Sequence, residues 1–181
     1  MSFNYKLHGN TNINLIKEKL IGLDWDAYEF RQKTYPVHSK TKTIPLIWGE
    51  RKTNIKYWPN YELFKSNISE IQILLNTIIG AGTIETVILI NLPKYQKIDS
   101  HYDNGDYFSK RNRIHIPIIT NEHCFFEIEG EIKTMKVGEI WEINNNEKYH
   151  SVENNGNEDR IHLLIDFLPI SNTTSKKTSI I

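Results

Sequence analysis

The sequence has a single cysteine, no excess of either charge and no long apolar run, and each absence excludes a class of protein. One cysteine, Cys124, cannot form an intramolecular disulfide framework. The 22 basic residues balance the 22 acidic ones, which disfavours a general nucleic-acid or membrane-surface binder, although a small anionic ligand needs only a local arginine. No apolar stretch is long enough for a signal-peptide core or a membrane span. We therefore expect a cytoplasmic protein with no nucleic-acid or membrane partner.

What is present indicates one globular domain, residues 1–170, followed by a polar tail, residues 171–181. Hydrophobic residues make up 39% of the chain, which is enough to build a core without disulfides. Residues 1–82 are expected to be mainly helical. Apolar spacings of three and four predict helices over 11–23, 24–32 and 59–82, with a strand over 43–48.

Residues 83–169 differ from the part before them, because short apolar runs alternate with turn residues. Eight strands are expected, in the runs "ETVILINL", "YQKIDSH", "RIHIPII", "HCFFEIEG", "EIKTM", "GEIWEIN", "YHSVEN" and "RIHLLIDF". Many short strands at regular spacing indicate a sandwich or barrel, and a jelly roll often holds a metal in its mouth. The expected fold class is α+β and mainly β. Its core is a cupin-like jelly roll (double-stranded β-helix) with N-terminal helices packed on it.

Three potential metal ligands belong to this core. His101 and Asp103 stand two positions apart, and His150 follows on a later strand. Side chains two apart on an extended segment point to the same side, so the three could form the two-His, one-carboxylate triad of non-haem Fe(II) oxygenases. Each part has an alternative, since Asp103 could form the turn in "YDNGD" and His150 could be a half-buried strand histidine.

Two strands repeat one pattern, with basic residues on one face and apolar residues on the other. "RIHIPI" carries Arg113 and His115, and "RIHLLID" carries Arg160 and His162. A buried arginine is costly without an anionic partner, and no run of carboxylates is placed opposite. A dicarboxylate cosubstrate would supply the partner and suit the planar guanidinium. The alternative is that either arginine points to solvent.

His101-x-Asp103, "RNRIHIPI" and "GEIWEINNNEKYHSVENNGNEDRIHLLIDF" together resemble the aspartyl/asparaginyl β-hydroxylase family, over roughly residues 86–169. Its members are Fe(II)- and 2-oxoglutarate-dependent oxygenases with a jelly-roll fold. The resemblance implies a role for six residues: iron is bound by His101, Asp103 and His150, the far carboxylate of 2-oxoglutarate by Arg160, and its keto-acid end lies near Arg113 and His115.

Asp103 stands where the animal, peptide-hydroxylating members have glycine, so the chain resembles the complete-triad branch, which includes hydroxylases of free proline. The resemblance implies hydroxylation of an unactivated C–H bond of an amino acid or derivative, consuming O2 and releasing succinate and CO2. A small molecule is thus the expected partner. The alternatives are a carrier-tethered aminoacyl group or a peptide side chain as substrate, a cupin-type metal-binding or sensing domain without turnover, and a cupin-type isomerase or dioxygenase. The oligomeric state stays open.

Substrate selectivity is expected to come from the N-terminal part. Arg31 and His38 could meet a substrate carboxylate, and Trp58 or Tyr107 could wall the pocket. For each of these residue types a structural role is the more common one. The polar stretch over residues 104–112 is long enough to act as a lid.

Overall fold

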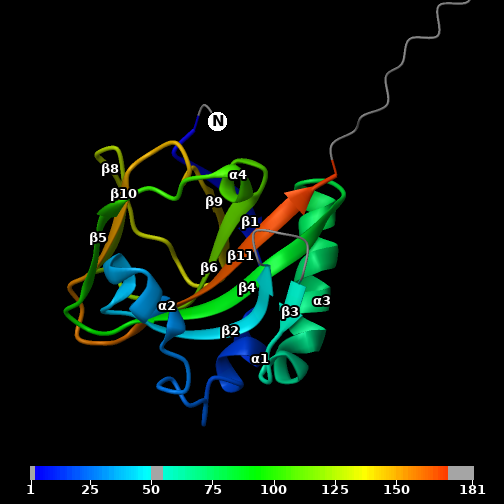
Figure 1. Cartoon of the computed structure of the whole chain (residues 1–181), viewed down its shortest axis with the longest axis horizontal. Coiled ribbons are helices and arrows are strands. Elements are labelled where there is room, and N and C mark those ends of the chain that lie inside the picture. The colour runs from blue at the N-terminus through cyan, green and yellow to red at the C-terminus, as the bar shows by residue number, and fades with distance from the viewer. Residues whose placement is uncertain (1–2, 50–54, 171–181) are drawn as a thin grey trace, which may run out of the picture.

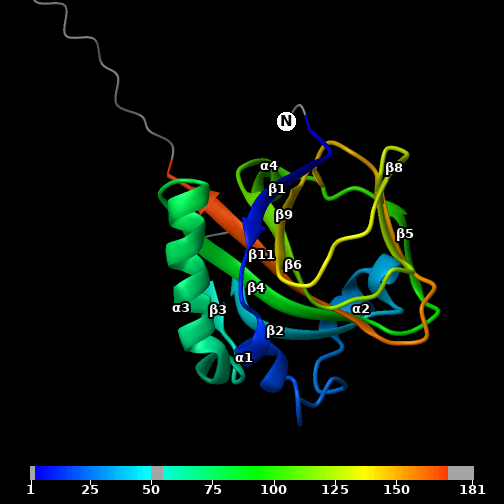
Figure 2. The same cartoon turned by 180° about the vertical axis from the view of Figure 1, so that it is seen from behind.

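Two antiparallel sheets make up most of the molecule in the computed structural model, which describes residues 3–49 and 55–170 (Figures 1 and 2). Within those residues the larger sheet runs in the order β1 (Tyr5–Asn10), β9 (Glu139–Ile143), β6 (Asn112–Ile119), β11 (Arg160–Pro169), β4 (Gly82–Leu92), β2 (Lys42–Gly49) and β3 (Ile55–Tyr57). The smaller sheet runs β5 (Lys97–His101), β10 (His150–Asn154), β7 (Cys124–Ile128) and β8 (Glu131–Lys133).

The strand order is that of a jelly roll, because strands that are neighbours in space come from distant parts of the sequence. The long strand β11 lies between β6 and β4, and it pairs with both in antiparallel register over most of its length. The two sheets form the two layers of the roll, with a hollow between them. The expected fold is therefore confirmed, as are all eight strands expected between residues 83 and 169.

Helices cover the outer face of the larger sheet and the mouth of the roll (Figure 1). The described residues contain five helical segments: α1 (Asn14–Glu18), α2 (Phe30–Thr34), the 3-10 turn η1 (Pro36–His38), α3 (Tyr61–Ile78) and α4 (Asp106–Ser109). The long helix α3 runs along the outside of the larger sheet, as both views show. Among the helices of the described ranges, none has the length and apolar character needed to cross a membrane.

The period-two alternation of β6 and β11 places the main apolar core outside the roll and the polar residues inside it. Ile114 and Ile116 of β6 pack with Ile165 of β11 in the core that also contains apolar residues of α1 and α3. Arg113 and His115 point the other way and line the interior. Both faces of these strands are thus largely buried, the outer face among apolar side chains and the inner face along the cavity.

The N-terminal part departs from the expectation of helices packed on a complete β core. Three strands, β1, β2 and β3, come from it and extend the larger sheet at both edges. Of these three strands only β2 was expected, over residues 43–48. The other two are short edge strands whose residues are largely exposed or half-buried, so they carry little of the apolar alternation that identifies a strand.

Two of the expected helices are shorter than their apolar spacing suggests. The helix expected over 11–23 ends at Glu18, and Gly22 beyond it adopts a positive φ of 81°. The helix expected over 24–32 begins only at Phe30. Before it, the side chain of Asp24 accepts a hydrogen bond from the backbone N–H of Asp26 and forms a local turn.

Candidate active site

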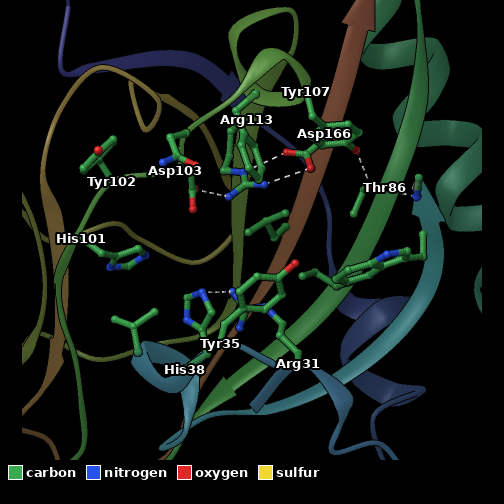
Figure 3. Close-up of a pocket in the computed structure, with 17 residues that line it drawn as sticks. Arg31, Tyr35, His38, Thr86, His101, Tyr102, Asp103, Tyr107, Arg113 and Asp166 are labelled. Atoms are coloured by element: carbon green, nitrogen blue, oxygen red, sulfur yellow. Dashed lines mark hydrogen bonds and ion pairs between the residues drawn. The ribbon is translucent and has the colours of Figure 1, made fainter. Parts of the chain in front are cut away.

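A cavity of about 400 Å³ opens into the roll from its mouth (Figure 3), and a narrower one continues inward between the sheets. The two cavities share six lining residues: Arg31, His38, His101, Asp103, Arg113 and Leu164. His150, His115, Arg160 and His162 line only the inner cavity. All of the residues expected to bind iron or 2-oxoglutarate therefore line one continuous space.

Strand pairing brings His101 and His150 together. His101 ends β5 and lies opposite His150, the first residue of β10, with ring centroids 4.3 Å apart. Asp103 follows two residues after His101, and its backbone N–H donates to the carbonyl of Asn145 at 2.9 Å. The three side chains predicted to form the triad thus lie at the same edge of the roll.

The carboxylate of Asp103 is not free in this arrangement. It accepts a hydrogen bond from the Asn145 amide at 2.7 Å and forms an ion pair with Arg113. Burial raises the pKa of Asp103, but the charge of Arg113 and the hydrogen bond from Asn145 lower it, and the pKa lies below its usual range. Within residues 3–49 and 55–170, no three His, Cys, Asp or Glu side chains already stand close enough to share a metal ion.

The donor atoms nevertheless fit Fe(II). The Nδ1–H of His101 donates to the carbonyl of Asp99 at 2.8 Å, which leaves its Nε2 lone pair for a ligand. Burial lowers the pKa of His150 to about 4, so this imidazole is neutral at neutral pH, as a metal ligand must be. Two neutral imidazoles and an ionised carboxylate are the ligand set of the non-haem iron triad.

Arg113 forms ion pairs with two carboxylates, contrary to the expectation that the sequence offers it no internal partner. Its Nε and Nη2 donate to the two carboxylate oxygens of Asp166 at 2.8 and 3.0 Å, and Nη1 contacts Asp103 (Figure 3). Asp166 lies directly opposite Arg113 in the pairing of β11 with β6. The signal was present in "RIHLLID", because Asp166 lies an even number of positions after Arg160 and His162 and therefore on the same strand face.

Arg160 has the opposite surroundings. It is 4% exposed, and no carboxylate of the described residues forms an ion pair with it. Its Nη2 donates to Nδ1 of His162 at 3.0 Å. Burial and then the charge of Arg160 lower the pKa of His162 well below its ordinary value, so His162 is neutral and carries its proton on Nε2, which is buried and without a partner in the described structure.

The N-terminal residues singled out for the substrate divide into two groups. Arg31, His38 and Tyr107 line the outer cavity. Trp58 is not among the lining residues; it stacks on Phe30 with ring centroids 5.4 Å apart, behind the cavity wall. The tryptophan that does line the cavity is Trp48, which no sequence pattern distinguished from Trp58.

Three lining or supporting residues were not anticipated: Asn145, Asp166 and Thr86. Asn145 follows β9 and holds Asp103 through both its side chain and its carbonyl. Thr86 on β4 contacts the hydroxyl of Tyr107 at 2.6 Å. No spacing rule identifies Asn145 or Thr86, because each acts through a residue that is distant in the sequence.

Comparison with known proteins identifies the family of this chain. The sequence profile described as aspartyl/asparaginyl beta-hydroxylase matches residues 4–169. A search of curated protein sequences finds no match. Among solved structures, a 2OG-Fe(II) oxygenase-family oxidoreductase from Burkholderia pseudomallei is similar with a TM-score of 0.59 at 11% identity, covering 71% of this chain and 67% of that one.

Two prolyl hydroxylases are similar over nearly the whole chain. The viral collagen prolyl hydroxylase of Paramecium Bursaria Chlorella virus-1 has a TM-score of 0.57 at 11% identity, covering 93% of this chain and 98% of that one. A Pseudomonas putida prolyl-4-hydroxylase has a TM-score of 0.54 at 10% identity, covering 93% and 94%. At such identities these likenesses establish the fold, whereas the profile match spans the whole cavity. The chain belongs to the aspartyl/asparaginyl β-hydroxylase family of 2-oxoglutarate-dependent oxygenases.

Proposed function

We propose that this hydroxylase acts on an unactivated C–H bond of an amino acid or amino-acid derivative, consuming 2-oxoglutarate and O2 and releasing succinate and CO2. His101, Asp103 and His150 would hold Fe(II). The bound iron would supply the activation of O2, which no side chain can perform. The observation that carries the proposal is the pairing of a non-haem iron ligand set with a buried arginine, Arg160, that lacks a carboxylate partner in the described structure.

Arg160 and His162 would bind the far carboxylate of 2-oxoglutarate. The guanidinium offers charge-assisted N–H donors, and the unpartnered Nε2–H of His162 offers another. Supplying an anion there would remove the cost of a buried, unpaired cation. His115, whose Nδ1 is also buried and without a partner in the described structure, would lie near the keto-acid end.

Arg113 has a different task in this proposal. Its ion pairs with Asp166 and Asp103 hold the Asp103 carboxylate at the edge of the cavity, next to the two histidines. Asn145 fixes the same carboxylate from the other side. These contacts position a ligand, and they restrain its rotation before the metal arrives.

The test is an anaerobic titration of the full chain with Fe(II) and then 2-oxoglutarate, followed by visible absorbance. A weak charge-transfer band, formed when the keto acid chelates iron, is expected in the wild type. It should be lost in Asp103→Ala and His150→Ala, and weakened in Arg160→Met. Bound iron without a band would remove the keto-acid cosubstrate. A band without succinate release towards any substrate would favour a metal-binding domain without turnover.

A peptide side chain is the second candidate substrate. The observation in its favour is that a similar structure is described as a prolyl hydroxylase from Trichoplax adhaerens in complex with a hypoxia-inducible-factor peptide fragment; it covers 92% of this chain with a TM-score of 0.56 at 10% identity. Succinate release with proline-containing peptides, but with no small acid or amino acid, would favour it.

A further inference from the structure

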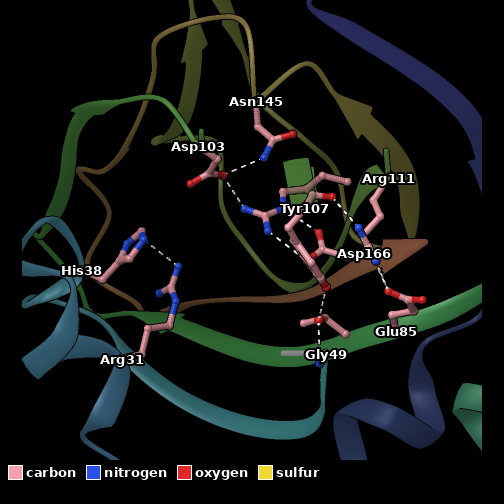
Figure 4. A network of polar contacts seen from close by, with 11 residues as sticks. Arg31, His38, Gly49, Glu85, Asp103, Tyr107, Arg111, Asn145 and Asp166 are labelled. Carbon is pink, nitrogen blue, oxygen red and sulfur yellow. Dashed lines mark hydrogen bonds and ion pairs between the residues drawn. The ribbon is translucent and has the colours of Figure 1, made fainter. Parts of the chain in front are cut away.

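A second arginine–histidine pair faces the cavity and has no part in the scheme above. Arg31 on α2 donates from Nη2 to Nε2 of His38, at the end of η1, at 2.9 Å (Figures 3 and 4). Both side chains line the outer cavity, and they are only 6% and 8% exposed. They are held beside the iron ligands, since the rings of His38 and His101 are 5.2 Å apart.

Each member of this pair keeps a buried nitrogen without a partner. Because a guanidinium can only donate, Nε2 of His38 is the acceptor, and the proton of the neutral ring sits on Nδ1. That Nδ1 and Nη1 of Arg31 both lack a hydrogen-bond partner among the described residues. An unpartnered buried donor is costly, and more so when it is charged. Both side chains line one cavity, and an anion with two acceptor oxygens would satisfy both donors.

The pair repeats the design of Arg160 and His162 at the inner end. In both pairs a buried arginine donates to a neutral histidine, and in both the second ring nitrogen is buried without a partner in the described structure. Neither arginine forms an ion pair within the described ranges. If the inner pair receives one carboxylate of the cosubstrate, the outer pair is built for a carboxylate from a second molecule.

The net charge of the residues that line the two cavities also favours an anion. Among the described residues that line them, three arginines, Arg31, Arg113 and Arg160, face two aspartates, Asp103 and Asp166. The doubly charged metal and the doubly charged cosubstrate of the proposed function would cancel each other. One positive charge is left over, and Arg31 is the arginine that neither the aspartates nor the cosubstrate would neutralise.

Among the described residues, the same lining holds no unengaged carboxylate for a substrate ammonium. Both aspartates are engaged by the guanidinium of Arg113. The wall next to the cavity is instead apolar, formed by Ile88, Leu164 and the partly buried Trp48. A ligand that fits these surroundings has one carboxylate, an apolar body and no positive charge.

We infer that Arg31 and His38 bind the carboxylate of the substrate, and that this substrate is an amino-acid derivative whose nitrogen is uncharged, as in an N-acylated amino acid. This inference rests on the proposed function and narrows its substrate class.

The experiment is calorimetric binding under nitrogen to the full chain, both metal-free and loaded with Fe(II) and 2-oxoglutarate. The probes are proline, leucine and phenylalanine, each as the free amino acid, the N-acetyl acid and the N-acetyl amide. At least one N-acetyl acid is expected to bind about tenfold or more tightly than its amide, because hydrogen bonds to a charged group contribute about 1.5–3 kcal/mol. In Arg31→Gln this preference should fall to about one, with Arg31→Lys between the two.

Lys33→Gln is the matched control, since it removes a positive charge from the same helix at an exposed position paired with Glu29; it should keep the wild-type preference. The inference is overturned if no acid binds, if acid and amide bind equally, or if a free amino acid binds tenfold more tightly than its N-acetyl form.

The charge-transfer band separates this inference from the proposed function. A band in both the wild type and Arg31→Gln, together with a lost acid preference in the variant, supports both. A band lost on replacing Arg31 would assign that residue to the cosubstrate and overturn the inference. Acid binding that depends on Arg31 without any band in the wild type would remove the proposed function and leave the carboxylate site standing.

Discussion

The tripeptide Arg-Ile-His occurs twice in this chain, and its two copies meet opposite electrostatic surroundings. Residues 113–115 lie on β6 and residues 160–162 on its antiparallel neighbour β11, so the copies face the interior from different ends. Arg113 has two carboxylate partners, whereas Arg160 has only a histidine partner among the described residues. What the opposite strand places across from an arginine, and not the local sequence, decides whether it is part of the structure or free to bind a ligand.

The largest expected difference is in stability. Arg113→Met would leave Asp103 and Asp166 buried and unpaired, and breaking a buried ion pair in this way costs about 3–5 kcal/mol of unfolding free energy. Arg160→Met would remove a buried cation with no carboxylate partner, so the expected change is within about 1 kcal/mol. Urea unfolding of the metal-free proteins measures both. Equal losses in the two variants would contradict the assignment of different roles to the two copies.

Ligand binding should show the reverse order. Arg160→Met is expected to weaken 2-oxoglutarate binding to the metal-loaded protein by about 30-fold or more, because hydrogen bonds to a buried charged group contribute about 1.5–3 kcal/mol. Arg160→Lys should lose less, since it keeps the charge but not the planar fork. Calorimetry gives both affinities. Unchanged affinity in Arg160→Met would move the cosubstrate away from the inner cavity.

The sequence predicted that each arginine shares a strand face with its histidine, but it left open whether that face is the interior, and it did not predict the partner of Arg113. The shared face follows from the period-two alternation of a strand, which "RIHIPI" and "RIHLLID" carry clearly. The partner depends on strand register across 53 positions, and register is set by the packing of whole sheets. The same limit explains why Asn145 was missed.

The N-terminal part was harder to predict for a related reason. Arg31 and His38 meet because the chain leaves α2 at Tyr35 in an extended conformation and re-enters a helical turn at Pro36. Such a break has no periodicity. The residue types suggested a carboxylate site, but the contact between the two side chains needed the tertiary structure.

His115 and His162 have similar electrostatic surroundings, although the two arginines do not. The pH dependence of stability tests this similarity. Burial, and then the charge of Arg160, hold the pKa of both His115 and His162 well below the ordinary value. The unfolded chain takes up a proton below about pH 6.5 that the folded chain does not, so the free energy of unfolding falls as the pH falls. Each such histidine is expected to contribute a loss of about 1.4 kcal/mol between pH 7.5 and 5.5.

His162→Gln should therefore reduce that loss by about 1.4 kcal/mol, measured by urea unfolding with a chelator present. His123→Gln, at an exposed position, should keep the wild-type pH dependence. If the two variants show the same pH dependence, His162 binds a proton in the folded state, and its proposed donor role fails.

The smallest expected effect concerns the segment before the first copy, which carries a helical turn, α4, over the mouth of the cavity. The hydroxyl of Tyr107 on α4 bonds Thr86 on β4 at 2.6 Å, and Thr86 also accepts the backbone N–H of Gly49 at 3.1 Å (Figure 4). Thr86→Val removes both bonds, and a net loss of about 1 kcal/mol should make the segment open about fivefold more often.

Trypsin cleavage at Lys110 or Arg111, in the native protein, reports that opening. Thr83→Val is the matched control, because Thr83 is an exposed residue of the same strand, and it should be cleaved at the wild-type rate. Equal cleavage of all three proteins would mean that Thr86 does not hold the segment closed. If iron, 2-oxoglutarate and a bound acid also leave the wild-type cleavage rate unchanged, the segment is not a lid, and the first copy of the tripeptide differs from the second in its carboxylates alone.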